Sequence, residues 1–286
     1  MPLQSAVSGL LWPKDGAWPP YYKGAPLAEQ HRKKEEMPAA TIQLSAREVY
    51  QEHQYQRHNL GTKGVTSDGR TFRYARNGAV LGIAGNVQQG ALPVANHNET
   101  VVGAARIRAV GDLTVSSTLG GTEAAADLYA EGYVHVNKTD GVGTVYTIHR
   151  AYKAGDGHAA VSSGAVITAN IDAPIKVALV AASELAFSKN PYDATIIMPS
   201  PATAVTVGVM PHAVTAAYYY WLQTGGVAGV LADASCLIGD VVVGSASNNG
   251  AVMPSAAYET DGPAVGILVK VPATGEYGAV KLTLDN

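Results

Sequence analysis

The sequence predicts a mainly β protein: antiparallel β-sandwich or β-barrel modules with an extended N-terminal arm and one or two short helices. Three observations favour this fold class. Glycine contributes 31 and proline 15 of the 286 residues, a proportion typical of a chain with many turns. From Gly69 onward, short apolar or alternating runs follow one another between turn residues, which is the pattern of antiparallel sheet. No long helical pattern or fixed-period repeat occurs, so a doubly wound sheet, a propeller and a solenoid are not expected.

The first 40 residues predict an extended arm. They contain six prolines, each of which lacks a backbone donor, so regular helix or sheet is not expected there. They also contain Trp12, Trp18, Tyr21 and Tyr22, large rings that are costly to leave in water. We therefore expect these four residues to hold the arm against a surface, either its own or a partner's.

Two short helices are predicted after the arm. Ser45 and Glu48 have the spacing of a capping box, so the first helix is expected within Leu44–His58. The second is the Ala-rich stretch Thr122–Ala130, with Thr122 as its cap. On this basis residues 1–65 form the arm and the first helix, 66–200 a β-rich domain, and 201–286 a β-barrel-like domain that can be continuous with the preceding one.

The predicted strands begin with two hairpins. Arg70–Tyr74 leads through the turn dipeptide Asn77-Gly78 into Val80–Ile83. Tyr133–Val136 pairs with Thr144–Tyr152, and its alternating side chains give one polar and one apolar face. The remaining predicted strands are Val101–Ile107, Leu113–Val115, Ala165–Thr168, Ile175–Val180, Ala194–Ile197, Ala204–Val209, Ala217–Gln223, Val227–Leu231, Val241–Val243, Ala264–Val271 and Ala279–Leu284.

Charge is unevenly distributed along the chain. The formal net charge is −3, but residues 1–76 hold 11 of the 20 Lys and Arg and 7 of the 23 Asp and Glu, a net of +4. Acidic residues such as Glu29, Glu35 and Glu36 are interleaved with these basic ones, so a docking arm or a solvated helix face is favoured over a nucleic-acid site. The first 20 residues do not resemble a signal peptide, and no apolar run is long enough to span a membrane. We therefore expect a chain made in the cytoplasm, with neither nucleic acid nor membrane as a partner.

Motifs for catalysis or cofactor binding are not found. The two glycine-rich phosphate-binding patterns, GxGxxG and GxxxxGK followed by Ser or Thr, are not present. The serine-hydrolase motif GxSxG and the zinc-binding motif HExxH are also not found. The acids mostly adjoin glycines, which is the ordinary turn role of aspartate. His135 and His149 are the one histidine pair to test as metal ligands, and the single Cys236 is predicted to be a buried thiol. The sequence thus predicts a protein that is not an enzyme and that holds no metal or cofactor.

Tyrosine is in excess, with 15 residues against two phenylalanines. A tyrosine ring suits a position that packs on one side and meets water or a polar partner on the other, so the excess favours interfaces, with half-exposed strand positions as the alternative. The strand pleat sends Tyr218 and Tyr220 to one face and Tyr219 and Trp221 to the other. Such a strand is covered on both faces, either between two sheets of one chain or between a sheet and a neighbouring subunit. These four residues, with the four rings of the arm, are the predicted interface residues.

Six short blocks stand out between residues 69 and 284: Gly69–Gly78, Ala130–Asn137, Gly143–Ile148, Asn190–Tyr192, Tyr220–Gly225 and Val265–Leu268. These blocks resemble a group of tailed-bacteriophage virion proteins. The last of these blocks also resemble small β-barrel head-decoration, or cement, proteins. The resemblance covers no catalytic signature, and the arm is outside it.

The resemblance implies a structural role. It implies a capsid decoration or minor capsid protein on the capsid exterior that binds the major capsid protein and itself, as a homotrimer, and locks capsomers together. A host-recognition or tail-fibre module is the alternative, and a virion-associated glycan hydrolase a weaker one. The major capsid protein itself is disfavoured because its long spine helix is not found here.

Overall fold

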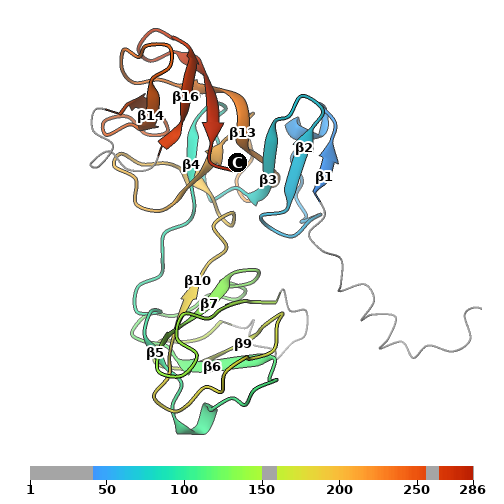
Figure 1. The fold of residues 1–286 in the computed structure, drawn as a ribbon, viewed down its shortest axis with the longest axis vertical. Coiled ribbons are helices and arrows are strands. Elements are labelled where there is room, and N and C mark those ends of the chain that lie inside the picture. Colours follow the sequence, from blue (N-terminus) through green and yellow to red (C-terminus); the bar gives the residue numbers. More distant parts are fainter. Residues whose placement is uncertain (1–40, 150–159, 256–263, 286) are drawn as a thin grey trace, which may run out of the picture. The chain divides into compact units, whose positions relative to one another are not determined.

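The structure is a computed structural model that describes residues 41–149, 160–255 and 264–285. The predicted arm, with Trp12, Trp18, Tyr21 and Tyr22, lies outside the described residues. The described residues belong to one compact unit. This unit is mainly β, with several antiparallel sheets and short 3-10 turns, so the predicted fold class is confirmed (Figure 1).

The largest sheet contains eleven strands among the described residues. Its main path is open, and it is antiparallel except where β1 pairs with β2. The order along this path is β1 (Ile42–Leu44), β2 (Lys63–Thr66), β3 (Thr71–Arg76), β13 (Tyr219–Leu231), β17 (Tyr277–Thr283), β16 (Ala264–Lys270), β14 (Val241–Gly244) and β15 (Val252–Pro254). Three further strands pair beside it: β4 (Val87–Gln89), β11 (Ile196–Ile197) and β12 (Thr206–Val209).

Strand β13 is the centre of this sheet and changes its partner halfway. Its first half pairs with β3, and from Gly225 onward it pairs with β17. The sequence predicts two strands separated by Gly225-Gly226, but the strand continues through both glycines. Gly226 has a φ of 77° and a bulge lies between Gln223 and Gly225, so the strand bends instead of ending. The Gln223 side chain supports the bend, because its Nε2 donates to the carbonyls of Gly225 and Val227.

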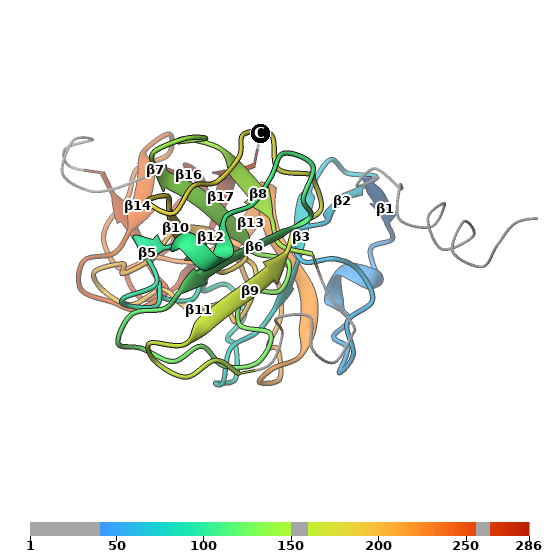
Figure 2. The ribbon, with the colours of Figure 1, turned by 90° about the horizontal axis from the view of Figure 1, so that it is seen from below.

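Two smaller sheets lie between β4 and β11 in the chain. One has the order β5 (Thr100–Val101), β10 (Glu184–Ser188), β7 (Tyr133–Lys138), β8 (Val145–Thr147), and the other pairs β6 (Thr114–Thr118) with β9 (Val166–Asn170). Both views show β6 and β9 side by side (Figures 1 and 2). Since β4 and β11 pair with each other, the chain leaves the large sheet and returns to it at neighbouring points.

The buried side chains form separate cores. Val115, Val134, Ile167 and Leu185 come from both smaller sheets and belong to one cluster, so these sheets pack as a sandwich around it. The large sheet contributes three further clusters, on the two sides of β13 and between β13, β14, β16 and β17. The predicted hairpin from Tyr133 forms, with Val134 and Val136 buried. Its second strand is β8, which is shorter than the predicted Thr144–Tyr152, and residues 150–152 lie outside the described residues.

The predicted helix Thr122–Ala130 is wrong. This stretch forms turns, because Ala124 exchanges two backbone hydrogen bonds with Val161 and Asp127 has a φ of 56°. The capping box is confirmed: the Ser45 amide donates to Glu48 Oε2 at 2.8 Å, and the Glu48 amide donates to Ser45 Oγ at 3.3 Å. The helix that it begins is a single 3-10 turn, η2 (Glu48–Tyr50).

Three strand predictions also differ from the structure. Val80–Ile83 and Ile175–Val180 are loops, and Val101–Ile107 leaves its strand after Val101 and continues into the 3-10 turn η3 (Ala104–Arg106). In the first two loops the backbone bonds to distant segments at single points instead of along a ladder. Gly82 bridges Val214, and Leu179 bridges Arg108.

Candidate interaction surface

The four aromatic residues that open β13 lie where the pleat predicts. Tyr220 belongs to one buried cluster, and the half-buried Tyr218 packs against it; Trp221 belongs to another, and Tyr219 packs against that. Both faces of the strand are therefore covered by the same chain. Trp221 lies with its ring 5.1 Å from Tyr74 of β3, and Tyr74 stacks on Tyr219. Packing inside one chain accounts for the burial of Tyr220 and Trp221, and an interface role for the four residues stays a prediction.

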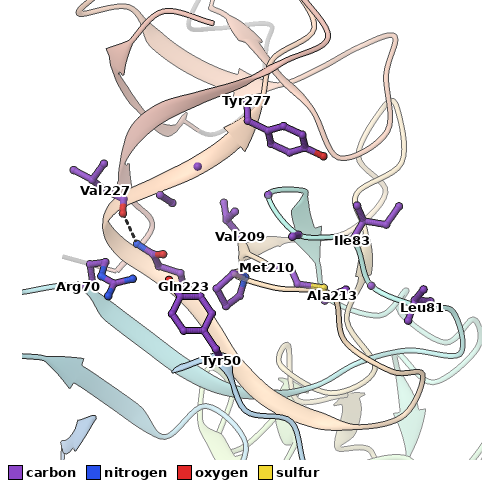
Figure 3. Close-up of a pocket in the computed structure, with 16 residues that line it drawn as sticks. Tyr50, Arg70, Leu81, Ile83, Val209, Met210, Ala213, Gln223, Val227 and Tyr277 are labelled. Carbon is purple, nitrogen blue, oxygen red and sulfur yellow. Dashed lines mark hydrogen bonds between the residues drawn. The ribbon is translucent and has the colours of Figure 1, made fainter. Parts of the chain in front are cut away.

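An open pocket of about 690 Å³ lies beside the second half of β13 (Figure 3). Its walls come from five stretches of the chain: η2, the turn before β3, the β3–β4 loop, the end of β12 with the β12–β13 loop, and the β13–β17 pair. We call it the groove. Its lining residues are Tyr50, Arg70, Leu81, Gly82, Ile83, Ala84, Gly85, Val209, Met210, Pro211, Ala213, Gln223, Val227, Ala228, Gly229 and Tyr277.

The backbone of the loop 81–85 is fixed by hydrogen bonds at both ends. The Gly82 amide donates to the Val214 carbonyl at 2.8 Å, and the Gly85 amide donates to the Met210 carbonyl at 2.7 Å. A β-carbon at Gly82 would lie 2.1 Å from the sulfur of Met210, so a side chain there would have to displace the end of the buried Met210 side chain. The loop is held in place, and its two large apolar side chains, Leu81 and Ile83, remain exposed.

Aromatic rings stand at opposite ends of the groove. Figure 3 shows Tyr277 at one end and Tyr50 at the other, and about half of each side chain is exposed. Tyr50 packs edge to face against His212, with ring centroids 6.1 Å apart. Burial lowers the pKa of His212, which therefore favours the neutral form beside the groove. The lining is thus apolar apart from Arg70, Gln223 and the tyrosine hydroxyls.

Arg70 is the charged residue of the groove. Its Nε donates to Asp68 at 2.8 Å, within the turn between β2 and β3, and its guanidinium lies 5.6 Å from the Phe72 ring centroid. The Asp68 carboxylate also accepts from the Thr66 hydroxyl and the Arg70 amide, so it has the turn role that its neighbouring glycine predicts.

A second apolar surface continues from the groove across the outside of the large sheet. Val227 pairs with Lys281, Lys281 with Ile267, and Ile267 with Val241, so these side chains form one row across β13, β17, β16 and β14. All four are exposed. We call Val227, Lys281, Ile267 and Val241 the outer row.

The outer row ends near further exposed apolar side chains. Val269, at the bulge that follows in β16, is also exposed. The turn before β14 lies next to β16, since the Gly239 amide donates to the Leu268 carbonyl, and it leaves Leu237 and Ile238 each 73% exposed. A contiguous apolar area rimmed by polar groups is typical of a binding surface.

His135 and His149, the two histidines to test as metal ligands, have different polar neighbours. His135 Nε2 lies 3.2 Å from the Ser188 hydroxyl, whereas His149 lies 4.0 Å from a carboxylate oxygen of Asp172. In the part of the chain that the structure describes, no group of three or more His, Cys, Asp or Glu could hold a metal ion. Cys236 is a free, buried thiol, as predicted.

Sequence reasoning did not find the groove. The run Val80–Ile83 reads as a buried strand, and Tyr277 falls outside the predicted strand Ala279–Leu284. One signal was present: Gly78, Gly82 and Gly85 recur through this apolar run, and such glycines mark close backbone approaches. Within the described ranges no helix is long and apolar enough to cross a bilayer. No known protein family, curated protein or solved structure matches the chain.

Proposed function

We propose that this chain is a structural virion protein that binds the outer surface of a phage capsid and stabilises it by bridging capsomers. The observation that carries the proposal is the outer row, an apolar sheet face exposed on a rigid scaffold. Val241, Ile267 and Val227 are 37%, 41% and 50% exposed, respectively, although each belongs to a hydrogen-bonded strand of the large sheet. Flat β surfaces of this kind suit contact with another folded surface.

The charge of the outer row suits a specific contact. Lys281 lies between Val227 and Ile267, so a partner must offer an apolar patch with an acceptor or a carboxylate near its centre. We assign this patch to the major capsid protein. Attachment through several copies, as in the expected homotrimer, would raise the effective affinity without a large contact for each copy.

The resemblance of the blocks within residues 69–284 to head-decoration proteins supports the same assignment. The Pro-rich arm, which has aromatic residues and belongs to the basic part of the sequence, would add contacts between neighbouring copies or with the capsid. The role is non-enzymatic, and it places the protein on the capsid exterior after synthesis in the host cytoplasm.

Cryo-electron microscopy of the native particle tests the proposal. We expect density for the β-sheets of this chain on the outside of the head, in many copies at symmetry-related positions, with the outer row facing the capsid. Particles that lack the chain should lose DNA at a lower temperature than complete particles. Density on the tail fibre, or absence from the particle, would overturn the assignment.

Host recognition remains the second candidate because one ring is placed as a carbohydrate-stacking residue would be. Tyr55 lies in the loop between η2 and β2 and is 79% exposed. Binding of the purified protein to bacterial surface glycans, abolished by Tyr55→Ala, would favour this function over capsid attachment.

A further inference from the structure

The groove is preformed and open, and an apolar lining of this kind is typical of a binding site. Its loop is fixed by the hydrogen bonds of Gly82 and Gly85, and its floor by the bend of β13. Its volume of about 690 Å³ falls within the range of roughly 300–1,000 Å³ that holds a ligand or a few large side chains. Leu81, Ile83 and Val227 border it with 59%, 47% and 50% of their surface exposed.

The lining favours an extended, proline-rich and aromatic segment. Grooves that bind such segments present aromatic rings, against which prolines and aromatic side chains pack at a low cost in conformational entropy. The groove presents Tyr50 and Tyr277 at its ends and Pro211 in its lining. It needs no charged ligand, because Arg70 already pairs with Asp68.

We propose that the groove binds the segment Trp12–Tyr22 of a second copy of this chain. The segment reads WPKDGAWPPYY and carries two Trp-Pro steps and a Pro-Pro-Tyr-Tyr sequence, which is the composition that the lining fits. The proposal rests on the oligomer that the proposed function requires, and it names the contact that holds the copies together.

The chain is long enough for this exchange. Lys23–Ala40 separates the segment from Thr41, where the described structure begins just before β1. These 18 residues reach up to about 60 Å when extended. A linker of this reach lets the arm of one copy extend to the groove of a neighbour. An exchanged arm ties two copies together, whereas an arm folded onto its own chain would not.

Photo-cross-linking of the full-length protein tests the proposal. In the variant Tyr277→benzoylphenylalanine, the reactive group replaces a ring that already lies at the groove. Irradiation should give a band at twice the 29.6 kDa of the chain on a denaturing gel. Trypsin and mass spectrometry should locate the link between Lys14 and Lys23, or at Trp12 or Pro13. The control variant Val145→benzoylphenylalanine, at an exposed position on β8, should not link to this segment.

Two arm variants complete the experiment. Trp18→Ala should reduce the dimer cross-link at least about fivefold, whereas Val7→Ala, outside the segment, should leave it unchanged. A link within one chain, a link to another segment, or an unchanged yield with Trp18→Ala would overturn the proposal. These results come from free protein, so they are independent of head binding. Arm exchange without head binding would overturn the proposed function alone. Head binding without the cross-link would overturn this inference alone.

Discussion

The ring of Tyr277 fills the space in which a side chain at Gly85 would lie. A β-carbon built on Gly85 would be 2.4 Å from Cε1 of Tyr277 and 3.2 Å from the carbonyl oxygen of Gly229. The Gly85 carbonyl also accepts from the Leu231 amide at 3.0 Å. One glycine therefore joins the loop of the groove to β13 and positions the aromatic ring at its end.

Gly85→Ala should destabilise the protein by about 2–3 kcal/mol, because alanine meets both a collision and a φ of 75°. Two controls separate these causes. Gly275→Ala has a φ of 83° with open space around it, so it should cost about 1 kcal/mol. Gly229→Ala has open space and ordinary backbone, so it should change little. Urea denaturation measures all three, and equal losses for Gly85→Ala and Gly275→Ala would show that Tyr277 does not occupy this space.

The carboxylate of Asp285 holds the end of the chain against β3. Arg73 donates to both of its oxygens, at 2.6 and 2.9 Å. These hydrogen bonds lower the pKa of Asp285 below its ordinary value of 3.8, against the opposing effect of burial. A lowered pKa in the folded state gives stability that is present above the ordinary value and is lost as the pH falls through the folded one.

We therefore expect Asp285→Asn to cost about 1 kcal/mol at pH 7. The difference from the wild type should shrink below about pH 4, where the carboxylate becomes protonated. Chemical denaturation at several pH values measures it. Glu184→Gln is the matched control, because its partner Lys138 is largely exposed to solvent and the pair should contribute little. A stability difference between Asp285→Asn and the wild type that stays constant from pH 7 to pH 3 would contradict stabilisation by the Arg73–Asp285 pair.

The hydroxyl of Tyr220 is a buried structural group. The side chain is fully buried, and its hydroxyl lies 2.9 Å from Thr195 Oγ1. Tyr220→Phe should cost about 1 kcal/mol through this hydrogen bond, and Tyr220→Ala about 3–5 kcal/mol through the cavity. Tyr218→Phe, at a half-buried ring in the same strand, should cost less than Tyr220→Phe. Thermal unfolding ranks the three variants, and a Tyr220→Phe protein as stable as the wild type would show that the hydrogen bond contributes nothing.

Local features of the fold could be predicted from the sequence, because their causes lie within a few residues. The Ser45–Glu48 capping box spans three residues, and the Tyr133 hairpin depends on alternation and a short turn. Thr122–Ala130 reads as a helix but instead pairs its backbone with Val161, a partner that no local pattern reveals. Such tertiary contacts override the helix propensity of the local sequence.

The candidate surfaces could not be predicted for the same reason. The groove joins stretches from Tyr50 to Tyr277, and the outer row depends on the registers of four strands. A shift of one residue in the pairing of β16 would bury Ile267 and expose Leu268. The aromatic stretch Tyr218–Trp221 is a local pattern that the sequence shows directly. Its two fully packed rings, Tyr220 and Trp221, are nevertheless buried within the same chain.

Binding to heads that lack this chain tests the central claim most directly. Purified wild-type protein and the variant Ile267→Asp are added to such heads, and bound protein is measured after sedimentation. Ile267→Asp should bind at least about tenfold more weakly, with an unchanged unfolding midpoint. The matched control Val166→Asp, at a similarly exposed strand position on β9, should bind like the wild type. Equal binding by Ile267→Asp and wild type, or no binding by either, would contradict attachment through the outer row.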